Sequence, residues 1–156
     1  MKATGLWWLI LSMALVGAPA VSSADTPAQP VAPPVIHTMS DFPTLYPGAY
    51  KRWRQLLPSQ FAGTTWLSQF DQFAGGASQI RSVNVGGATM IYGSECKRDD
   101  CGPNSVQVLA SPDGSRVVAL ASLAGGDAVL TIGSPTPVEL NCLKTLDGDE
   151  DKVTGC

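Results

Sequence analysis

The stretch Cys96-Lys97-Arg98-Asp99-Asp100-Cys101 organises this chain, because two cysteines enclose four charged residues and nothing else. On either side lie runs typical of β-strands, residues 88–92 (ATMIY) and 105–109 (SVQVL). A disulfide between the two cysteines would close this connection into a short, stiff loop that presents the four charges. Such a tip suits insertion into the cleft of a partner.

Working outward from the loop, the pattern predicts five strands in a meander, at residues 79–85, 88–95, 104–111, 116–123 and 128–132. The connections are short and rich in turn residues: Gly86-Gly87, Pro112-Asp113-Gly114-Ser115 and Gly125-Gly126-Asp127. Short connections make neighbouring strands antiparallel. We therefore expect an antiparallel sheet of about five strands.

Helices are predicted before the sheet. Tyr50, Trp53, Leu56 and Leu57 recur at three- and four-residue steps from Pro47 onward, which indicates an amphipathic helix that ends before Pro58. Thr64 and Thr65 are candidate N-caps for a short helix that carries Trp66, Leu67 and Phe70. The fold class is therefore α+β, with the N-terminal helices packed on one face of the sheet. Residues 138–143 are predicted as either a sixth strand or one helical turn.

The first 24 residues are typical of a secretory signal peptide. Lys2 precedes an apolar run over residues 6–16, and small residues follow it. We expect cleavage after Ala24, with Ala20 as the alternative. Residues 25–44 are predicted to be a flexible arm rich in proline, and residues 45–156 the folded domain with its disulfide-closed C-terminal tail. No later segment is apolar enough to span a membrane.

The charge balance is mildly acidic, with a formal net charge of −3 for the whole chain. This balance argues against nucleic acid as a partner and favours a basic protein. Catalysis is not expected either. The one histidine, His37, lies in the arm, and the adjacent carboxylates Asp99 and Asp100 do not flank a bond as a glycosidase pair must.

The chain has four cysteines, and export would place them in an oxidising compartment, which argues for two disulfides. Three connectivities are possible. Proximity in sequence favours Cys96–Cys101 and Cys142–Cys156. A zinc site is the competing interpretation, but His37 is distant from both cysteine pairs and the spacing is unusual for zinc. We expect no metal and no cofactor.

The order of these features resembles the Ivy family of periplasmic inhibitors of vertebrate (chicken-type) lysozyme. A helix ends at Leu56-Leu57-Pro58, a Trp66-Leu67 segment and a hairpin follow, then Cys-Lys-x-x-Asp-Cys, a valine-rich strand and a strand near Ala119-Leu120. The resemblance covers roughly residues 45 to 125. It implies a five-stranded antiparallel sheet with helices packed on it, a periplasmic location and a capacity to dimerise.

The resemblance also implies a function for the loop. The family loop, Cys-Lys-Pro-His-Asp-Cys, closes on its own disulfide and occupies the active-site cleft of the lysozyme. Cys96, Lys97, Asp100 and Cys101 match it, whereas Arg98 stands at the proline and Asp99 at the histidine. Because the histidine is replaced, we hypothesise that Arg98, with Lys97, forms a cationic tip that meets the catalytic carboxylates.

The expected function is thus inhibition of a peptidoglycan-cleaving hydrolase, first of all a chicken-type lysozyme. One alternative is an immunity protein that neutralises a muramidase or another wall hydrolase delivered by type VI secretion. Another is an envelope protein whose disulfide only stabilises a strand corner, with charges at the tip because the tip faces water.

Overall fold

The computed structural model describes residues 35–57, 65–69, 76–123, 129–146 and Cys156. All of them belong to one compact unit, Pro34–Cys156. The predicted signal peptide, the first ten residues of the predicted arm and the acidic stretch 147–151 lie outside the described residues. Among the described residues, no helix combines the length and the apolar character needed to cross a membrane.

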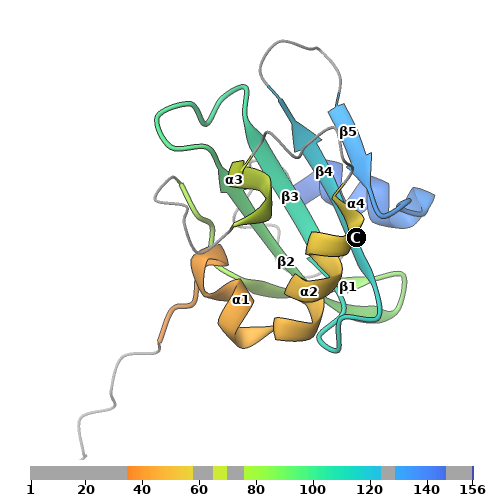
Figure 1. The fold of residues 1–156 in the computed structure, drawn as a ribbon. Coiled ribbons are helices and arrows are strands. Elements are labelled where there is room, and N and C mark those ends of the chain that lie inside the picture. The colour runs from red at the N-terminus through yellow and green to blue at the C-terminus, as the bar shows by residue number, and fades with distance from the viewer. Residues whose placement is uncertain (1–34, 58–64, 70–75, 124–128, 147–155) are drawn as a thin grey trace, which may run out of the picture. The chain divides into compact units, whose positions relative to one another are not determined.

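The predicted antiparallel sheet is confirmed (Figure 1). Its strands follow the order of the chain, β1-β2-β3-β4-β5, and every neighbouring pair is antiparallel. The bounds are β1 Arg81–Val85, β2 Ala88–Cys96, β3 Ser105–Ala110, β4 Val117–Ser122 and β5 Val129–Ile132.

The turns between the strands have the chemistry that the sequence indicated. Gly86 and Gly87 both have positive φ, of 58° and 89°, and Asn84 Oδ1 accepts a hydrogen bond of 3.0 Å from the Gly87 N–H. In the β3–β4 turn, Asp113 accepts hydrogen bonds from the Ser115 N–H and hydroxyl. These short turns hold the register of the hairpins.

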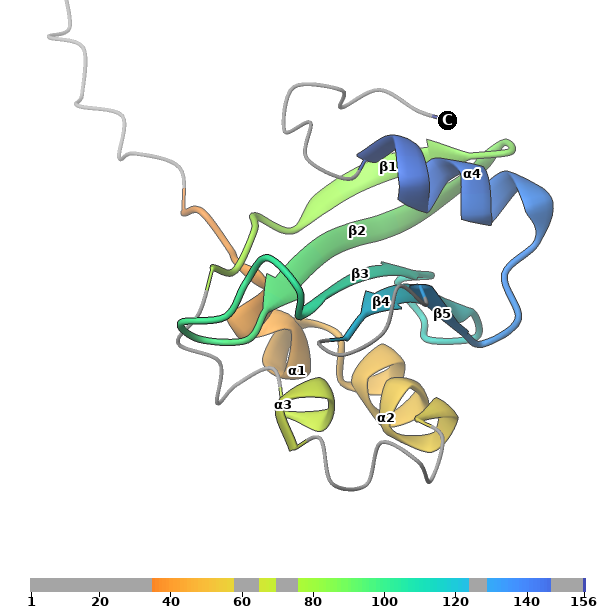
Figure 2. The same ribbon diagram turned by 90° about the horizontal axis from the view of Figure 1, so that it is seen from above.

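One face of the sheet is covered by the helices that precede it: η1 Met39–Asp41, α1 Phe42–Leu45, α2 Pro47–Leu56 and α3 Thr65–Ser68 (Figure 2). Trp53, fully buried, donates from Nε1 to the Leu67 carbonyl at 2.7 Å, and the Tyr50 hydroxyl donates to the Ser68 carbonyl at 2.8 Å. The Trp53 indole and the Tyr50 hydroxyl, both on α2, therefore fix the position of α3. The core on this face is formed by apolar side chains of the helices and of alternate strand positions, including Met39, Phe42, Leu67, Ile91, Val106, Val108, Ala119 and Ile132.

The opposite face is covered by α4, Pro137–Leu146, which Figure 2 shows on the other side of the sheet from α1, α2 and α3. The strand alternative for residues 138–143 was therefore wrong, whereas the helical alternative is confirmed in type, although the helix has ten residues and is longer than the one turn predicted. Its apolar side chains pack against the second set of alternate strand positions, Val83, Val85, Met90, Tyr92, Leu109, Val118 and Leu120. The sheet thus lies between two helical layers.

The predicted boundary between arm and domain, at residue 44, was also wrong. Met39 and Phe42 are buried, with exposed fractions of 0% and 1%. Thr38 forms a β-bridge with Gln79, and the Ile80 N–H donates to the His37 carbonyl. At Gly93 a Cβ would overlap the Met39 side chain, so glycine permits this close approach of η1 to the sheet. The folded unit therefore includes the residues just before α1.

The structure has the second predicted disulfide, Cys142–Cys156, with the two Cα atoms 5.1 Å apart. Cys142 is buried in α4, and the Cys156 N–H donates to the Asn84 carbonyl of β1 at 3.0 Å. The C-terminal residue thus contacts both the helix and the edge strand.

Candidate functional site

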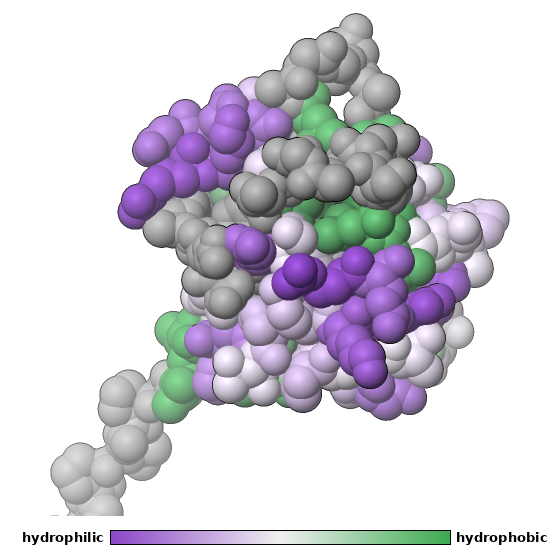
Figure 3. Space-filling view, viewed as in Figure 1, coloured by the Kyte–Doolittle hydropathy of each residue, from purple (hydrophilic) through white to green (hydrophobic). Residues whose placement is uncertain are grey.

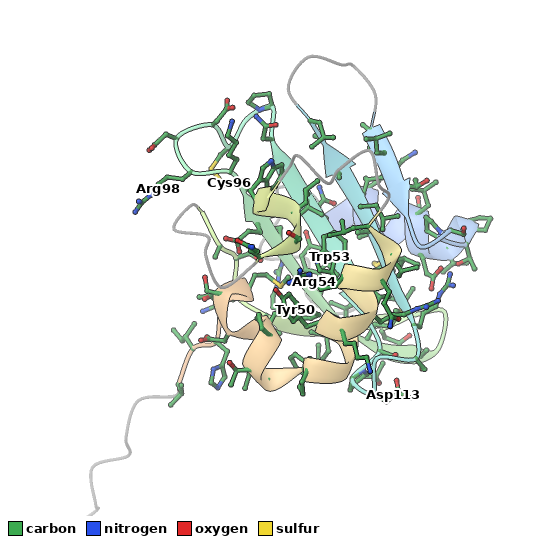
Figure 4. The ribbon with its side chains drawn as sticks, in the orientation of Figure 1. Tyr50, Trp53, Arg54, Cys96, Arg98 and Asp113 are labelled. Atoms are coloured by element: carbon green, nitrogen blue, oxygen red, sulfur yellow. A yellow bond between two sulfur atoms is a disulfide. The ribbon has the colours of Figure 1, made fainter. Side chains whose placement is uncertain are left out.

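The loop from Cys96 to Cys101 leaves the sheet at the end of β2. The structure joins Cys96 to Cys101, with an S–S distance of 2.06 Å and the Cα atoms 4.7 Å apart. Cys96 is the last residue of β2 and is buried, whereas Cys101 is exposed. The disulfide therefore attaches an exposed loop to a buried strand end (Figure 4).

The backbone of the loop forms its own turn. The Asp100 N–H donates to the Lys97 carbonyl at 3.1 Å, and Asp99 adopts a left-handed conformation with φ of 62°. Aspartate is one of the few residues other than glycine that tolerate this region. The Lys97 N–H donates to the Asn104 carbonyl at 3.0 Å, which extends the β2–β3 pairing by one bond beyond the last strand pair, Cys96 with Ser105.

Two of the four predicted tip charges interact with each other inside the loop. Lys97 Nζ lies 3.2 Å from Asp100 Oδ2, and the same oxygen accepts a hydrogen bond of 2.6 Å from Asn104 Nδ2. Asn104 is buried, with 4% exposed. Lys97 and Asp100 therefore link the two sides of the loop, while the Lys97 side chain remains 47% exposed beside Arg98.

The remaining two charges lie at the outer part of the loop. Arg98 and Asp99 are exposed, and Figure 4 shows the Arg98 side chain pointing away from the sheet and the helices. Hydrophilic side chains gather on the surface at the position of the loop (Figure 3). Of the six predicted loop residues, Arg98 and Asp99 are thus the pair that a partner would meet first.

The base of the loop rests on the segment that leads into β1. The Ser78 N–H donates to the Ser94 carbonyl at 2.9 Å, and the Ser94 N–H donates to the Ser78 hydroxyl at 2.7 Å. A Cβ at Gly76 would lie 3.1 Å from Cys96 Sγ, so this segment contacts the disulfide directly. The loop is therefore held from β3 on one side and from residues 76–78 on the other.

Glu95, the residue before Cys96, was not among the predicted site residues. Its side chain is 1% exposed, and neither carboxylate oxygen has a hydrogen-bond partner among the described residues. Burial raises its pKa to about 8. The alternation along β2 could have revealed it, because Glu95 shares a sheet face with Gly93 and Ile91, two and four positions earlier.

A second group of charged residues lies at the opposite end of the sheet. Arg116, just before β4, donates from Nε and Nη2 to the two carboxylate oxygens of Glu139 on α4, at 2.8 Å and 2.6 Å. The Thr136 N–H donates to Glu139 at 2.7 Å, and the Glu139 N–H donates to the Thr136 hydroxyl at 3.3 Å. This capping box and ion pair, mainly the Arg116 hydrogen bonds, lower the Glu139 pKa to about 2. We call these three residues the α4 anchor.

The α4 anchor lines one wall of a cavity of about 560 Å³, together with apolar side chains such as Val85, Met90 and Val138. The Glu139 carboxylate already accepts three hydrogen bonds from the protein. The charged wall of the cavity is therefore satisfied within the protein and serves to hold α4 to the sheet.

Other candidate residues do not converge on the loop. His37 Nδ1 lies 3.6 Å from Asp41 in an exposed pair beside η1. Lys51, Arg52 and Arg54 are exposed on α2, where Figure 3 shows a second hydrophilic patch. Across the part of the chain that the structure describes, no three His, Cys, Asp or Glu side chains gather closely enough to hold a metal ion.

Comparison with models of protein families gave no match for this chain, and neither did comparison with curated proteins. The resemblance to the Ivy family therefore stays a prediction from the sequence.

Proposed function

We propose that this protein is an exported inhibitor of a peptidoglycan-cleaving glycoside hydrolase, with a chicken-type lysozyme as the first target. The observation that carries the proposal is the loop Cys96–Cys101, which is closed by a disulfide, braced by Lys97 and Asp100, and exposes Arg98 and Asp99. A loop already ordered before binding loses little conformational entropy when it enters a cleft. Export to the periplasm, expected from residues 1–24, would bring it to such enzymes.

In this mechanism Arg98 supplies the main contact. A lysozyme cleft contains two carboxylates, one of which has a raised pKa. The planar guanidinium donates two parallel hydrogen bonds to a carboxylate, which suits it to such a site. The Arg98 side chain is exposed and points away from the sheet and the helices, so a partner that meets the loop can contact its guanidinium.

The overall charge supports the same class of partner. The chain is acidic, with a net charge of −3, and chicken-type lysozymes are typically basic. Opposite net charges accelerate the encounter of two proteins, and salt weakens that acceleration. We therefore expect the association rate to fall as ionic strength rises.

The test is inhibition of a chicken-type lysozyme acting on peptidoglycan, measured for wild type, Arg98→Ala and Arg52→Ala. Arg52 is an exposed arginine on α2 and serves as the matched control. Truncation of a central contact residue costs about 2 kcal/mol or more, so we expect at least a roughly tenfold higher inhibition constant for Arg98→Ala. Equal inhibition by all three proteins would exclude the role of Arg98, and no binding at micromolar protein would exclude the target.

Asp99 supports a second candidate, an immunity protein against a different wall hydrolase, such as a muramidase delivered by a rival bacterium. A carboxylate brought next to the two carboxylates of a lysozyme adds unfavourable like charge. The variant Asp99→His places an imidazole there, and histidine also tolerates positive φ. If Asp99→His inhibits chicken-type lysozyme and wild type does not, the natural target is another hydrolase.

A further inference from the structure

Glu95 occupies a position that controls the base of the loop. It precedes Cys96 on β2 and pairs with Val106 on β3. Two interactions separate Glu95 from the turn of the loop. They are the strand pair of Cys96 with Ser105 and the hydrogen bond from the Lys97 N–H to the Asn104 carbonyl. The Glu95 side chain is buried on the face covered by α1, α2 and α3, without a hydrogen-bond partner among the described residues.

The surroundings of Glu95 offer no compensating charge in the described part of the chain. In the loop, Lys97 is paired with Asp100. Burial alone accounts for the raised pKa of Glu95, with no charged group contributing to it. The loop and the elements on this face carry the following charged or titratable side chains: Lys97, Arg98, Asp99 and Asp100 in the loop, His37 and Asp41 at η1, Tyr46 after α1, and Tyr50, Lys51, Arg52 and Arg54 on α2.

We propose that Glu95 is a pH-sensitive positioning residue, whose ionisation opens the base of the loop and whose neutral form keeps it closed. On ionisation the carboxyl proton passes to water. The resulting carboxylate is unfavourable in the closed form, because the closed strand end keeps water away from it. The smallest opening that exposes it breaks the last strand pairs and the Lys97–Asn104 bond. Strand ends open locally more readily than whole sheets, so the rest of the sheet stays paired.

The sign of the effect follows from proton linkage. In the open form Glu95 has an ordinary pKa near 4.5, and in the closed form its pKa is about 8. Opening therefore releases a proton between these two values, and the opening equilibrium rises up to about tenfold per pH unit there. Above pH 8 the dependence levels off, because both forms are then ionised.

This inference deepens the proposed function, on which its consequence for inhibition rests: the loop would be best ordered for cleft insertion at mildly acidic pH. Its structural part can be measured without any hydrolase. Failure of the proposed function and failure of the pH effect are therefore distinguishable.

The test is amide hydrogen exchange by NMR at pH 5.5 and 7.5, corrected for the intrinsic exchange rates. Wild-type protection at Lys97 should fall roughly 70-fold between the two values. Glu95→Gln, which cannot ionise, should lose this dependence. Glu139→Gln is the matched control at the other end of the sheet, and its Lys97 amide should behave as in wild type, because Glu139 does not titrate in this range.

Three results would overturn the proposal. The first is equal wild-type protection at both pH values, and the second is an equal fall in Glu95→Gln. The third is a parallel fall in the middle of β3, since it would mean global rather than local opening. If Glu95→Gln does not fold, the carbon-13 titration of the Glu95 carboxyl in wild type decides. A midpoint near 8 supports the proposal and one near 4.5 contradicts it.

Discussion

Glu95 and Glu139 are both buried carboxyl groups, yet their surroundings have opposite consequences. Glu95, at the loop end, has no hydrogen-bond partner among the described residues, and burial raises its pKa to about 8. Glu139, in the α4 anchor, accepts three hydrogen bonds, and its pKa falls to about 2. Burial favours the neutral form, whereas donors placed around a carboxylate more than offset it. Glu139 therefore stays ionised while α4 remains attached to the sheet, whereas ionisation of Glu95 is unfavourable while the loop end is closed.

The two carboxyl groups should also make the free energy of unfolding depend on pH in opposite directions. Glu139 has a lowered folded-state pKa, so its contribution is present above pH 4.5 and is lost as pH falls toward 2. Glu95 has a raised folded-state pKa, so stability falls as pH rises from 4.5 to 8. From these two groups alone, the protein is most stable near pH 4.5.

The largest expected effects separate the two disulfides. Replacing Cys142 and Cys156 by serine opens a ring with a sequence separation of 14, and should lower the free energy of unfolding by about 3 kcal/mol. Replacing Cys96 and Cys101 opens a shorter ring, with a separation of 5, and should lower it by only about 2 kcal/mol. Denaturant titration measures both.

For inhibition of the hydrolase we expect the opposite order, with the larger effect from loss of Cys96–Cys101. Loss of Cys96–Cys101 removes the ordered loop, so we expect at least a roughly tenfold weaker inhibition, whereas loss of Cys142–Cys156 should leave inhibition nearly unchanged while the protein remains folded. The opposite ranking would place the inhibitory surface away from the loop.

Glu95→Gln should stabilise the protein by about 3 kcal/mol at pH 7, because the unfolded chain then no longer gains from ionising this side chain. The gain should vanish at pH 4, where the carboxyl is neutral in both states. Thermal denaturation at the two pH values provides the measurement. A loss of stability at pH 7 would show that the Glu95 carboxyl makes a favourable interaction.

Arg116→Ala should destabilise the protein by about 1–2 kcal/mol, since it leaves the Glu139 carboxylate buried beside one remaining donor. The Arg116 side chain is 39% exposed, and solvent screening keeps the loss below that of a fully buried pair. Adding Glu139→Gln in a double variant should recover part of the loss, which chemical denaturation can detect. A double variant less stable than Arg116→Ala would contradict the pairing.

The smallest expected effect concerns the tip. Asp99→Gly relieves the left-handed conformation, with φ of 62°, and should change stability by about 0.5 kcal/mol, because glycine also adds freedom to the unfolded chain. Denaturant titration beside Asp99→Ala measures it, and the alanine variant should be the less stable of the two. The reverse ranking would show that the Asp99 side chain itself stabilises the turn.

Much of the fold could be predicted because the relevant signals are local. Alternation and turn residues placed all five strands to within a few residues, and periodicity placed α2 from Pro47 to Leu56. The N-terminal boundary was missed because Met39 and Phe42 become core residues only through contact with the sheet, at Gly93 for Met39. The length of α4 was underestimated although its start carries a local signal, the capping box of Thr136 and Glu139 with Pro137 at the first helical position.

Sequence alone determined the sheet order, the residues of the loop and the proximity of Cys96 to Cys101, since each depends on neighbours along the chain. The tertiary structure decided how the charges of the loop pair, because Asp100 accepts a hydrogen bond from the buried Asn104 and forms an ion pair with Lys97. It also decided the opposite states of Glu95 and Glu139. The pKa of a buried carboxyl depends on donors and burial supplied by distant segments, and no local pattern records those contacts.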